Sequence, residues 1–507
     1  MRIEAKKLTA KSERGASLVI ALLAMLVLSV LSAGIIFVTH TEILTTANYT
    51  TLARARYAAE AGVQSTINWL SNNYTAPTSF TSYNTGKAPV WCISGCASNG
   101  GAVVLSAVSG VAANYPDSTV ASAYQSALSN QVLPGVSNAS YSTYATLLSM
   151  TPGTGASWLA GGGSSQTWQI TSQGNVAGVR NATVQVVATF ERTSTPIFTY
   201  AVFGVSATCG SVSFGGGGGT DSFDSSAGTY AATEQLTLGN IGSNGNFSLS
   251  GGGGTAPLIK VIGGTLSTPK SGTGNCVVGS PDALTIGSGW TTGALTQLSA
   301  PVTYPTPLAP SPTPPTTGQN IRNNCSSITG CSCYPFGGYA CTNSGPYRLT
   351  PGTYGDLLMG GGKTLHLSAG TYVVNTLTLS GGSVIIVDSG PVILNAAAQG
   401  VSAGSCCAVD FSGGTVSNVG GLPSNFQIVY GGTASIDMSG GSGAYAVVYA
   451  PNAPVSIGGG GDLYGAIIGA TVDNSGGTSI HFDRALLNQF QSGVGGFRPI
   501  GFSWSKF

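Results

Sequence analysis

Few side chains in this sequence have the types and spacing that catalysis requires. Only 7% of the 507 residues are charged, and three are histidines. The strongest enzymatic hypothesis is cleavage of a polysaccharide, which needs two or more carboxylates, or carboxylates with Lys or Arg, on adjacent elements. Acids of the C-terminal half are instead spread singly, as at Asp388, Asp410, Asp437, Asp462 and Asp473. We therefore expect no catalytic residue, no cofactor and no enzymatic activity.

Two pairs of polar residues could each contribute to a site. His481 and Asp483 alternate along one predicted strand and so share a face, as an acid/base pair would. A structural hydrogen bond in a terminal coil is the favoured interpretation. Asp221 and Asp224 could contribute to a calcium site, but two carboxylates fall short of the roughly six to eight oxygen ligands required. Turn capping is favoured there, and no metal site is predicted.

The ten cysteines are an even number and follow an export-type N-terminal segment, which indicates disulfides formed in an oxidising compartment. One turn-rich stretch holds four of them in a spacing that is unusual for zinc, with no histidine nearby, so local disulfides are favoured over a metal. Two others are adjacent and could pair with each other or with separate partners. The candidate disulfide cysteines are Cys92, Cys96, Cys325, Cys331, Cys333, Cys341, Cys406 and Cys407.

The N-terminal segment changes abruptly in character after its first fourteen residues. Five basic residues precede an uncharged run from Ala16 to Val38. As a helix this run is roughly 35 Å long, enough to cross a bilayer. The basic flank predicts a cytoplasmic N-terminus and export of the remainder. We therefore expect a transmembrane helix over residues 16–38, in contact with membrane lipid.

The helical pattern continues beyond the membrane-length run, as an ordinary signal peptide would not. Small and apolar residues recur at spacings of three and four as far as Leu70. Arg56 and Glu60 lie one turn apart as a potential ion pair. One helix over residues 16–70 is predicted. A filament built by stacking helices uses such a rod, whereas a secreted domain does not.

Two short motifs flank this apolar run and carry a family resemblance. The sequence RGASLV, which starts at Arg14, and the later sequence AAEAG resemble the N-terminal segment of the PilX-type minor pilins of type IV pilus systems. The resemblance covers roughly residues 13–65 and depends on both motifs together with the apolar helix. The residues of the second motif are Ala58, Ala59, Glu60, Ala61 and Gly62.

The resemblance implies processing and a set of partners. A prepilin peptidase would cut after Gly15, so that residues 1–15 are a leader peptide and Ala16 is the N-methylated mature N-terminus. The implied partners are other pilins and minor pilins, the prepilin peptidase and the inner-membrane pilus assembly platform. Major pilins carry a Glu at the fifth mature position, where its carboxylate pairs with a neighbour's terminal amine. This chain has Ile20 instead, which implies a tip or initiating position.

Residues 71–195 are predicted to form a pilin-like α+β head. Their clearest elements are two β-rich runs, 167–173 and 182–190, joined by a turn-prone sequence that indicates a hairpin. This hairpin would give the N-terminal helix a sheet to pack against.

Residues 196–507 change to short apolar-alternating segments separated by Gly, Ser and Asn clusters. This pattern predicts a Gly-rich β-solenoid, with a β-sandwich as the rival architecture. Residues 301–317 are too Pro-rich for a coil and are predicted to be an extended loop, followed by the Cys-rich stretch. The sequences DSFDSSAG and SIHFDRAL are similar to uncharacterised solenoid regions of PilX-like proteins. The expected inward residues are Leu365, Leu367, Val373, Leu377, Leu379, Val384, Ile386, Val392, Leu394, Ile428, Val447, Ile457 and Ile467.

These features together predict a minor pilin-like subunit that functions in filament initiation or assembly and displays a solenoid, with an adhesive role if that solenoid binds a surface. It would be single-pass in the bacterial inner membrane before assembly and extracellular afterwards. The formal net charge of +1 provides no field for nucleic acid, which is not an expected partner. The alternatives are a type II secretion minor pseudopilin, and a surface adhesin or polysaccharide-acting enzyme on a membrane anchor.

Overall fold

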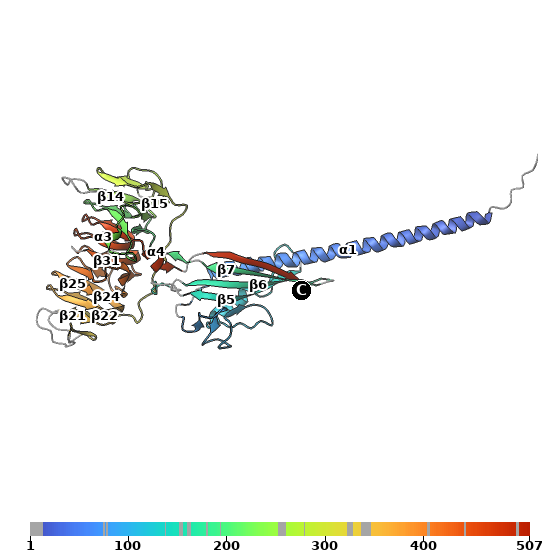
Figure 1. Ribbon diagram of the computed structural model, residues 1–507, viewed down its shortest axis with the longest axis horizontal. Helices are drawn as coiled ribbons and strands as arrows, with labels where there is room; N and C mark the ends of the chain where they lie inside the picture. The colour runs from blue at the N-terminus through green and yellow to red at the C-terminus, as the bar shows by residue number, and fades with distance from the viewer. Residues whose placement is uncertain are drawn as a thin grey trace, which may run out of the picture.

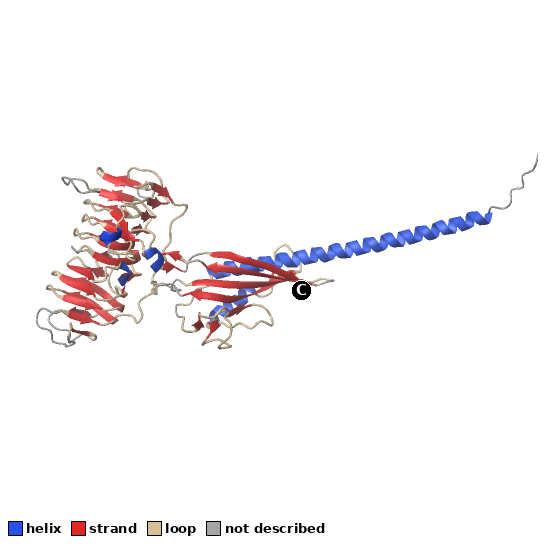
Figure 2. Ribbon diagram, viewed as in Figure 1, coloured by secondary structure: helices blue, strands red, loops and turns tan. Residues whose placement is uncertain are grey.

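A computed structural model describes residues 14–506 except 75–76, 78–79, 137, 152–155, 160–163, 179–180, 193, 252–259, 278, 322–327, 336–345, 403–405, 441–442 and 493–495. The described chain has three parts in a row, which are a long helix, an α+β head and a block of stacked strands (Figure 1). Strands dominate the head and the block (Figure 2). The predicted fold class, mainly β with a long N-terminal helix, an α+β head and a solenoid, is confirmed.

Helix α1 (Arg14–Asn72) is unbroken over 59 residues, as the continuous helical pattern predicts. Its C-terminal part packs against the head, whereas residues 16–50 are almost entirely exposed. Within the described ranges it is the one helix long and apolar enough to cross a membrane.

The head is built on an antiparallel sheet in the order β3-β5-β6-β7-β35, with β4 paired to β5. Helix α1 lies across β5, β6 and β7. Helix α2 (Ser118–Leu128) is capped at its N-terminus by Asp117, whose side chain accepts from the backbone N–H of Thr119. The predicted hairpin is present as β6 and β7, which pair along their full length. The strands are β3 (Val104–Ser106), β4 (Gln131–Val132), β5 (Ala139–Thr151), β6 (Ser165–Val176), β7 (Ala182–Arg192) and β35 (Phe497–Lys506).

The last strand requires a correction to the predicted domain boundaries. Strand β35 pairs antiparallel with β7, so the C-terminal residues belong to the head and not to a solenoid that runs to residue 507. The solenoid is therefore an insertion between two neighbouring strands of the head. Its two connections run side by side, because β8 (Thr195–Pro196) pairs with β34 (Gln491–Ser492). The alternating pattern of a strand does not indicate which sheet the strand joins, so the sequence alone could not assign β35 to the head.

The inserted block is a solenoid and not a sandwich, since its successive coils pair in parallel register, apart from the short strand Cys331–Cys333, which pairs antiparallel. The chain enters the solenoid from the head near the middle of the stack of coils and winds toward one end of the stack. The strands of this first half are β9 (Val202–Gly204), β10 (Val212–Phe214), β11 (Thr220–Phe223), β12 (Ile241–Ser243), β13 (Phe247–Leu249), β14 (Lys260–Ile262), β15 (Leu266–Thr268), β16 (Leu284–Ile286), β17 (Trp290–Thr292) and β18 (Leu295–Gln297).

The second half starts at the opposite end and winds back until β32 and β33 pair with β9, β10 and β11, which closes one continuous stack (Figure 1). The strands are β19 (Gly318–Ile321), β20 (Cys331–Cys333), β21 (Tyr347–Leu349), β22 (Gly352–Met359), β23 (Thr364–Leu367), β24 (Gly370–Leu379), β25 (Ser383–Val387), β26 (Val392–Ala396), β27 (Val409–Asp410), β28 (Gly414–Asn418), β29 (Phe426–Tyr430), β30 (Ile436–Asp437), β31 (Ala444–Ile457), β32 (Leu463–Asn474) and β33 (Ile480–Asp483).

The Pro-rich residues 301–317 connect the two halves as an extended segment that runs along the solenoid. Val302 N donates to Asn244 Oδ1 at one level of the stack, and the Tyr449 hydroxyl donates to Pro305 O at another. At the far end Asp356 N donates to Thr317 O. These three hydrogen bonds are made with the solenoid flank and not through strand pairing within the segment, as its Pro content requires.

All but two of the expected inward residues are buried, although Val373 lies outside the solenoid core, to which its neighbours Tyr372 and Val374 belong. Val384 and Ile386 point outward, and their neighbours Ile385 and Val387 are buried instead. The run SVIIV is apolar on both faces, so its alternation does not select which face turns inward, and a one-residue shift exchanges the two sets.

Candidate functional site

The N-terminal half of α1 is an apolar surface without a partner in the described chain. Ile20, at the fifth position after Gly15, is 68% exposed. Each such side chain would gain about 1.5–3 kcal/mol on transfer from water to apolar surroundings. The exposed large apolar side chains of this half are Leu18, Val19, Ile20, Leu22, Leu23, Met25, Leu26, Val27, Leu28, Val30, Leu31, Ile35, Ile36, Phe37, Val38 and Ile43.

The AAEAG motif lies where α1 meets the head sheet. Ala58 and Ala59 are fully buried against the sheet. A Cβ on Gly62 would lie 2.2 Å from Ser172 Oγ, so this glycine allows the helix to lie close to β6. Gly174 does the same from the sheet, because a Cβ there would lie 2.0 Å from Ala55 O. The motif is therefore a close-packed helix–sheet contact.

The other two residues of the motif, Glu60 and Ala61, are only partly buried. Glu60 Oε1 lies 2.8 Å from Arg56 Nε, which is the ion pair that the spacing predicts. Ala61 is half-buried. The processing positions lie in the first turn of α1, which begins at Arg14, so cleavage between Gly15 and Ala16 would leave the rest of the helix intact.

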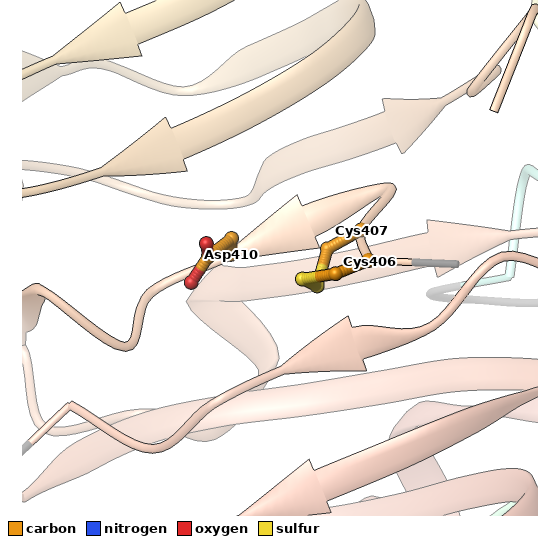
Figure 3. A group of neighbouring side chains, drawn as sticks. All are labelled: Cys406, Cys407 and Asp410. Atoms are coloured by element: carbon orange, nitrogen blue, oxygen red, sulfur yellow. A yellow bond between two sulfur atoms is a disulfide. The ribbon is translucent and has the colours of Figure 1, made fainter. Parts of the chain in front are cut away.

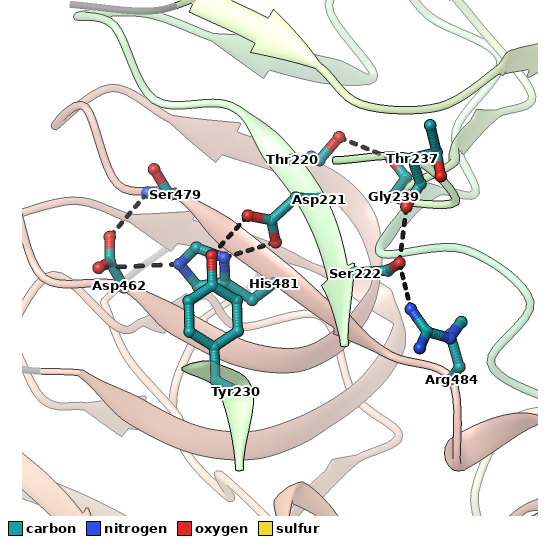
Figure 4. A network of polar contacts seen from close by, with 10 residues as sticks. All are labelled: Thr220, Asp221, Ser222, Tyr230, Thr237, Gly239, Asp462, Ser479, His481 and Arg484. Atoms are coloured by element: carbon teal, nitrogen blue, oxygen red, sulfur yellow. Dashed lines mark hydrogen bonds and ion pairs between the residues drawn. The ribbon is translucent and has the colours of Figure 1, made fainter. Parts of the chain in front are cut away.

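A polar cluster in the solenoid surrounds His481 on β33 (Figure 4). His481 Nδ1 lies 2.6 Å from Asp221 Oδ1 on β11, and Nε2 lies 3.7 Å from Asp462 Oδ2. The hydroxyl of Tyr230, in the short helix α3 (Tyr230–Thr233), donates to Asp221 Oδ2. The cluster joins the first coil to the last at the point where the solenoid closes.

The carboxylates determine the charge of this histidine. Burial alone lowers the pKa of His481, but Asp221 and Asp462 outweigh burial and raise the pKa to about 9. The His481 imidazolium in turn holds the pKa of Asp462 below its usual range. The cluster is thus an ion-paired link between coils near neutral pH.

Asp483 does not pair with His481, although the two residues share a strand. Its carboxylate accepts from Ser225 N at 3.0 Å and from Ser225 Oγ at 2.6 Å. Burial raises the pKa of Asp483, and these hydrogen bonds oppose the rise. Asp224 accepts from Ser226 N at 3.0 Å, which is the predicted turn cap. The residues of the two suspected pairs are therefore divided between different local contacts.

Aromatic rings extend the cluster along the solenoid. Tyr445, Tyr464 and His481 occupy matching positions on successive coils. Their rings stack at centroid distances of 4.3 and 4.5 Å. Tyr445 and Tyr464 thus pack on each other, and Tyr449, on the same strand as Tyr445, is fully buried.

Several acids that look isolated in the sequence align in the fold. Asp410 and Asp437 are register partners on adjacent coils, and Asp473 follows two coils further along the same row. Asp410 and Asp437 each accept from a backbone N–H two residues later, and Asp473 accepts from Ser213 Oγ. Asp388, on another face, lies 2.8 Å from His366 Nδ1.

The cysteines form disulfides in the described residues, where none is free. Cys92 pairs with Cys96, and Cys209 pairs with Cys276. Cys331 and Cys333 are also disulfide-bonded, whereas Cys325 and Cys341 lie outside the described residues.

The adjacent cysteines pair with each other. Figure 3 shows the bond between Cys406 and Cys407, with Asp410 nearby. These three residues are close enough to share a metal ion, but metal ligation by cysteine requires thiolates, which a disulfide does not offer.

The head contacts the solenoid through Trp158, a residue that no pattern in the sequence singles out. Its Nε1 donates to Gln427 Oε1 at 2.9 Å, and its ring centroid lies 4.3 Å from that of Tyr449. Trp158 O accepts from Leu308 N of the Pro-rich segment. The junction therefore joins head, solenoid and Pro-rich segment.

A domain family described as a domain of unknown function (DUF7305) matches residues 313–489, less than half of the chain. The match spans the second half of the solenoid. No curated protein matches. Among solved structures, that of the competence-associated pilin ComZ from Thermus thermophilus matches with a TM-score of 0.28 and 13% identity, over 90% of this chain and 98% of that chain. A similarity at this TM-score carries no conclusion about fold or function.

Proposed function

We propose that this chain is a low-copy, minor pilin-like subunit of a type IV filament, related to the PilX type, that presents the solenoid at the filament end. The observation that carries the proposal is the division of α1 into two halves. One half is an exposed apolar rod of membrane length, and the other is fixed against a sheet by small residues. Such a helix needs lipid before assembly and neighbouring helices afterwards.

The position of the solenoid supports an end location. It lies at the end of the head opposite the free half of α1, and its long axis runs across the direction of that helix (Figure 1). In a filament whose subunits stack along α1, such a crosswise block would collide with the next subunit. Ile20 supports the same location, because it has no carboxylate to pair with a neighbour's amine.

The proposed pathway includes cleavage after Gly15 by a prepilin peptidase, insertion in the inner membrane and extraction by the assembly platform. A type II secretion pseudopilin would share the helix and the head. We also propose that the solenoid is not a polysaccharide-cleaving enzyme, since the hydrogen bonds of its aligned acids hold them in local turns and contacts.

Immunogold electron microscopy of sheared filaments tests the proposal. We expect gold at one end of a filament, or at rare sites. Continuous gold labelling along the shaft would show that the chain is a major subunit. Gold confined to the membranes of cells that still assemble normal filaments would show that it is a membrane-anchored surface protein.

A further inference from the structure

A pocket of about 370 Å³ lies beside the junction between head and solenoid. One wall is the short helix α4 (Leu486–Gln489) with Phe490, and the other is the start of β29 with the preceding turn. Its volume falls within the range of roughly 300–1,000 Å³ that is usual for small-molecule sites.

Three carboxamide side chains at this pocket have unused hydrogen-bonding groups. Gln489 Oε1 is buried and accepts no hydrogen bond from the described part of the chain. The side-chain amides of Asn425 and Asn488, which also line the pocket, make no hydrogen bond within the described residues. Buried acceptors are nearly always paired in folded proteins, so Gln489 Oε1 requires a donor that the described residues do not supply.

The lining residues are all uncharged: Ser424, Pro391, Phe490 and a fourth carboxamide, Gln427, which is already hydrogen-bonded, lie beside the three carboxamides. A carboxamide presents a donor and an acceptor side by side, which matches a pair of neighbouring hydroxyls. An anion would find no counter-charge among these residues, and a wholly apolar ligand would leave the amides unpaired.

We propose that this pocket binds an uncharged, hydroxyl-rich ligand, namely one unit of a neutral saccharide. Asn488 and Gln489 hydrogen-bond its hydroxyls, and Pro391 packs against its carbon skeleton. This inference goes beyond assembly of the chain into a filament and does not depend on it.

Saturation-transfer NMR on the full chain tests the proposal. The chain is held in nanodiscs, because many detergents carry sugar head groups that would compete for the pocket. The probes are the methyl α-glycosides of glucose, galactose and mannose, with glucuronate as the charged comparison. We expect saturable binding of at least one neutral glycoside, with a dissociation constant on the order of millimolar. Retention of the chain on an immobilised neutral polysaccharide, reversed by the free glycoside and not by glucuronate, would identify a polymer as the source. Binding of the free glycoside alone would identify a small sugar.

Two variants localise the binding. Asn488→Ala and Gln489→Ala should each weaken it about tenfold, as expected for one lost hydrogen bond. Gln297→Ala, which removes the same type of side chain from the exposed strand β18, should leave it unchanged. Asn488 is exposed, so its variant remains decisive even if Gln489→Ala lowers stability. Absence of saturable binding, equal affinity in Asn488→Ala, or stronger binding of glucuronate would overturn the proposal.

Discussion

Replacing Gly174 by alanine should separate α1 from the head sheet. The new Cβ would lie 2.0 Å from Ala55 O and 2.5 Å from Ala59 N, both of which are helix backbone atoms that cannot rotate away. Relief to the usual contact distance of about 3.5 Å requires a shift of roughly 1–1.5 Å between helix and sheet. Such a shift weakens the packing of Ala58 and Val63 along the same contact.

Overpacking of this kind costs about 1–3 kcal/mol. For a domain the size of the head, this corresponds to a fall in melting temperature of roughly 2–10 °C. The measurement is thermal unfolding of the full chain in nanodiscs, followed by tryptophan fluorescence. Trp168 is a fully buried reporter on β6, the strand that contains Gly174.

Gly318→Ala is the matched control, because Gly318 also lies in a strand but has no atom within 4 Å of the position that a Cβ would occupy. It should melt within about 1 °C of the unmodified chain, given that exposed substitutions are usually worth less than about 0.5 kcal/mol. If Gly174→Ala melts together with this control, the close contact between α1 and β6 does not limit stability and the reasoning fails.

Three further changes have defined outcomes. Because the pKa of His481 rises from 6.5 to about 9 on folding, its ion pairs stabilise the solenoid below pH 6.5 by up to about 3 kcal/mol, and this contribution is lost as pH rises through 9. Urea unfolding at a series of pH values should show this loss of stability. If the His481→Gln variant has the same pH profile of stability as the unmodified chain, the ion pairs are not its cause. Trp158→Ala should expose the junction between head and solenoid, so that the backbone amides of β8 and β34 exchange faster while those of coils far from the head keep their rates. If the variant changes the rates equally in all coils, or not at all, Trp158 does not hold the two parts together. Coexpression with a prepilin peptidase should remove residues 1–15, as intact mass would report, and a cut after Ala33 or later would indicate an ordinary signal peptide.

The parts of the fold that depend on local pattern could be predicted. The apolar run and the three- and four-residue spacing indicate α1 almost to its last residue, and the two β-rich runs indicate the β6–β7 hairpin. Short alternating segments with Gly-rich turns indicate a solenoid. Each of these signals arises from residues close in sequence, whose backbone preferences and faces repeat with a fixed period.

The contacts that depend on distant residues could not be predicted. His481 pairs with Asp221 across 260 positions and not with Asp483, which lies on the same strand. The pocket beside α4 likewise combines side chains from separate coils. No periodicity in the sequence relates such positions, because the number of residues per coil varies and the strand register of each coil depends on the coil before it.

By itself, the sequence determined the membrane-length helix, its continuation into a head and the repeated strands of a solenoid, because composition and periodicity act locally. Only the tertiary structure decided that the solenoid is inserted between β7 and β35 and that its chain enters at mid-height. It also decided which acids meet His481. These features follow from strand pairing between segments hundreds of residues apart, where many registers satisfy the same alternating pattern and packing of the whole chain selects one.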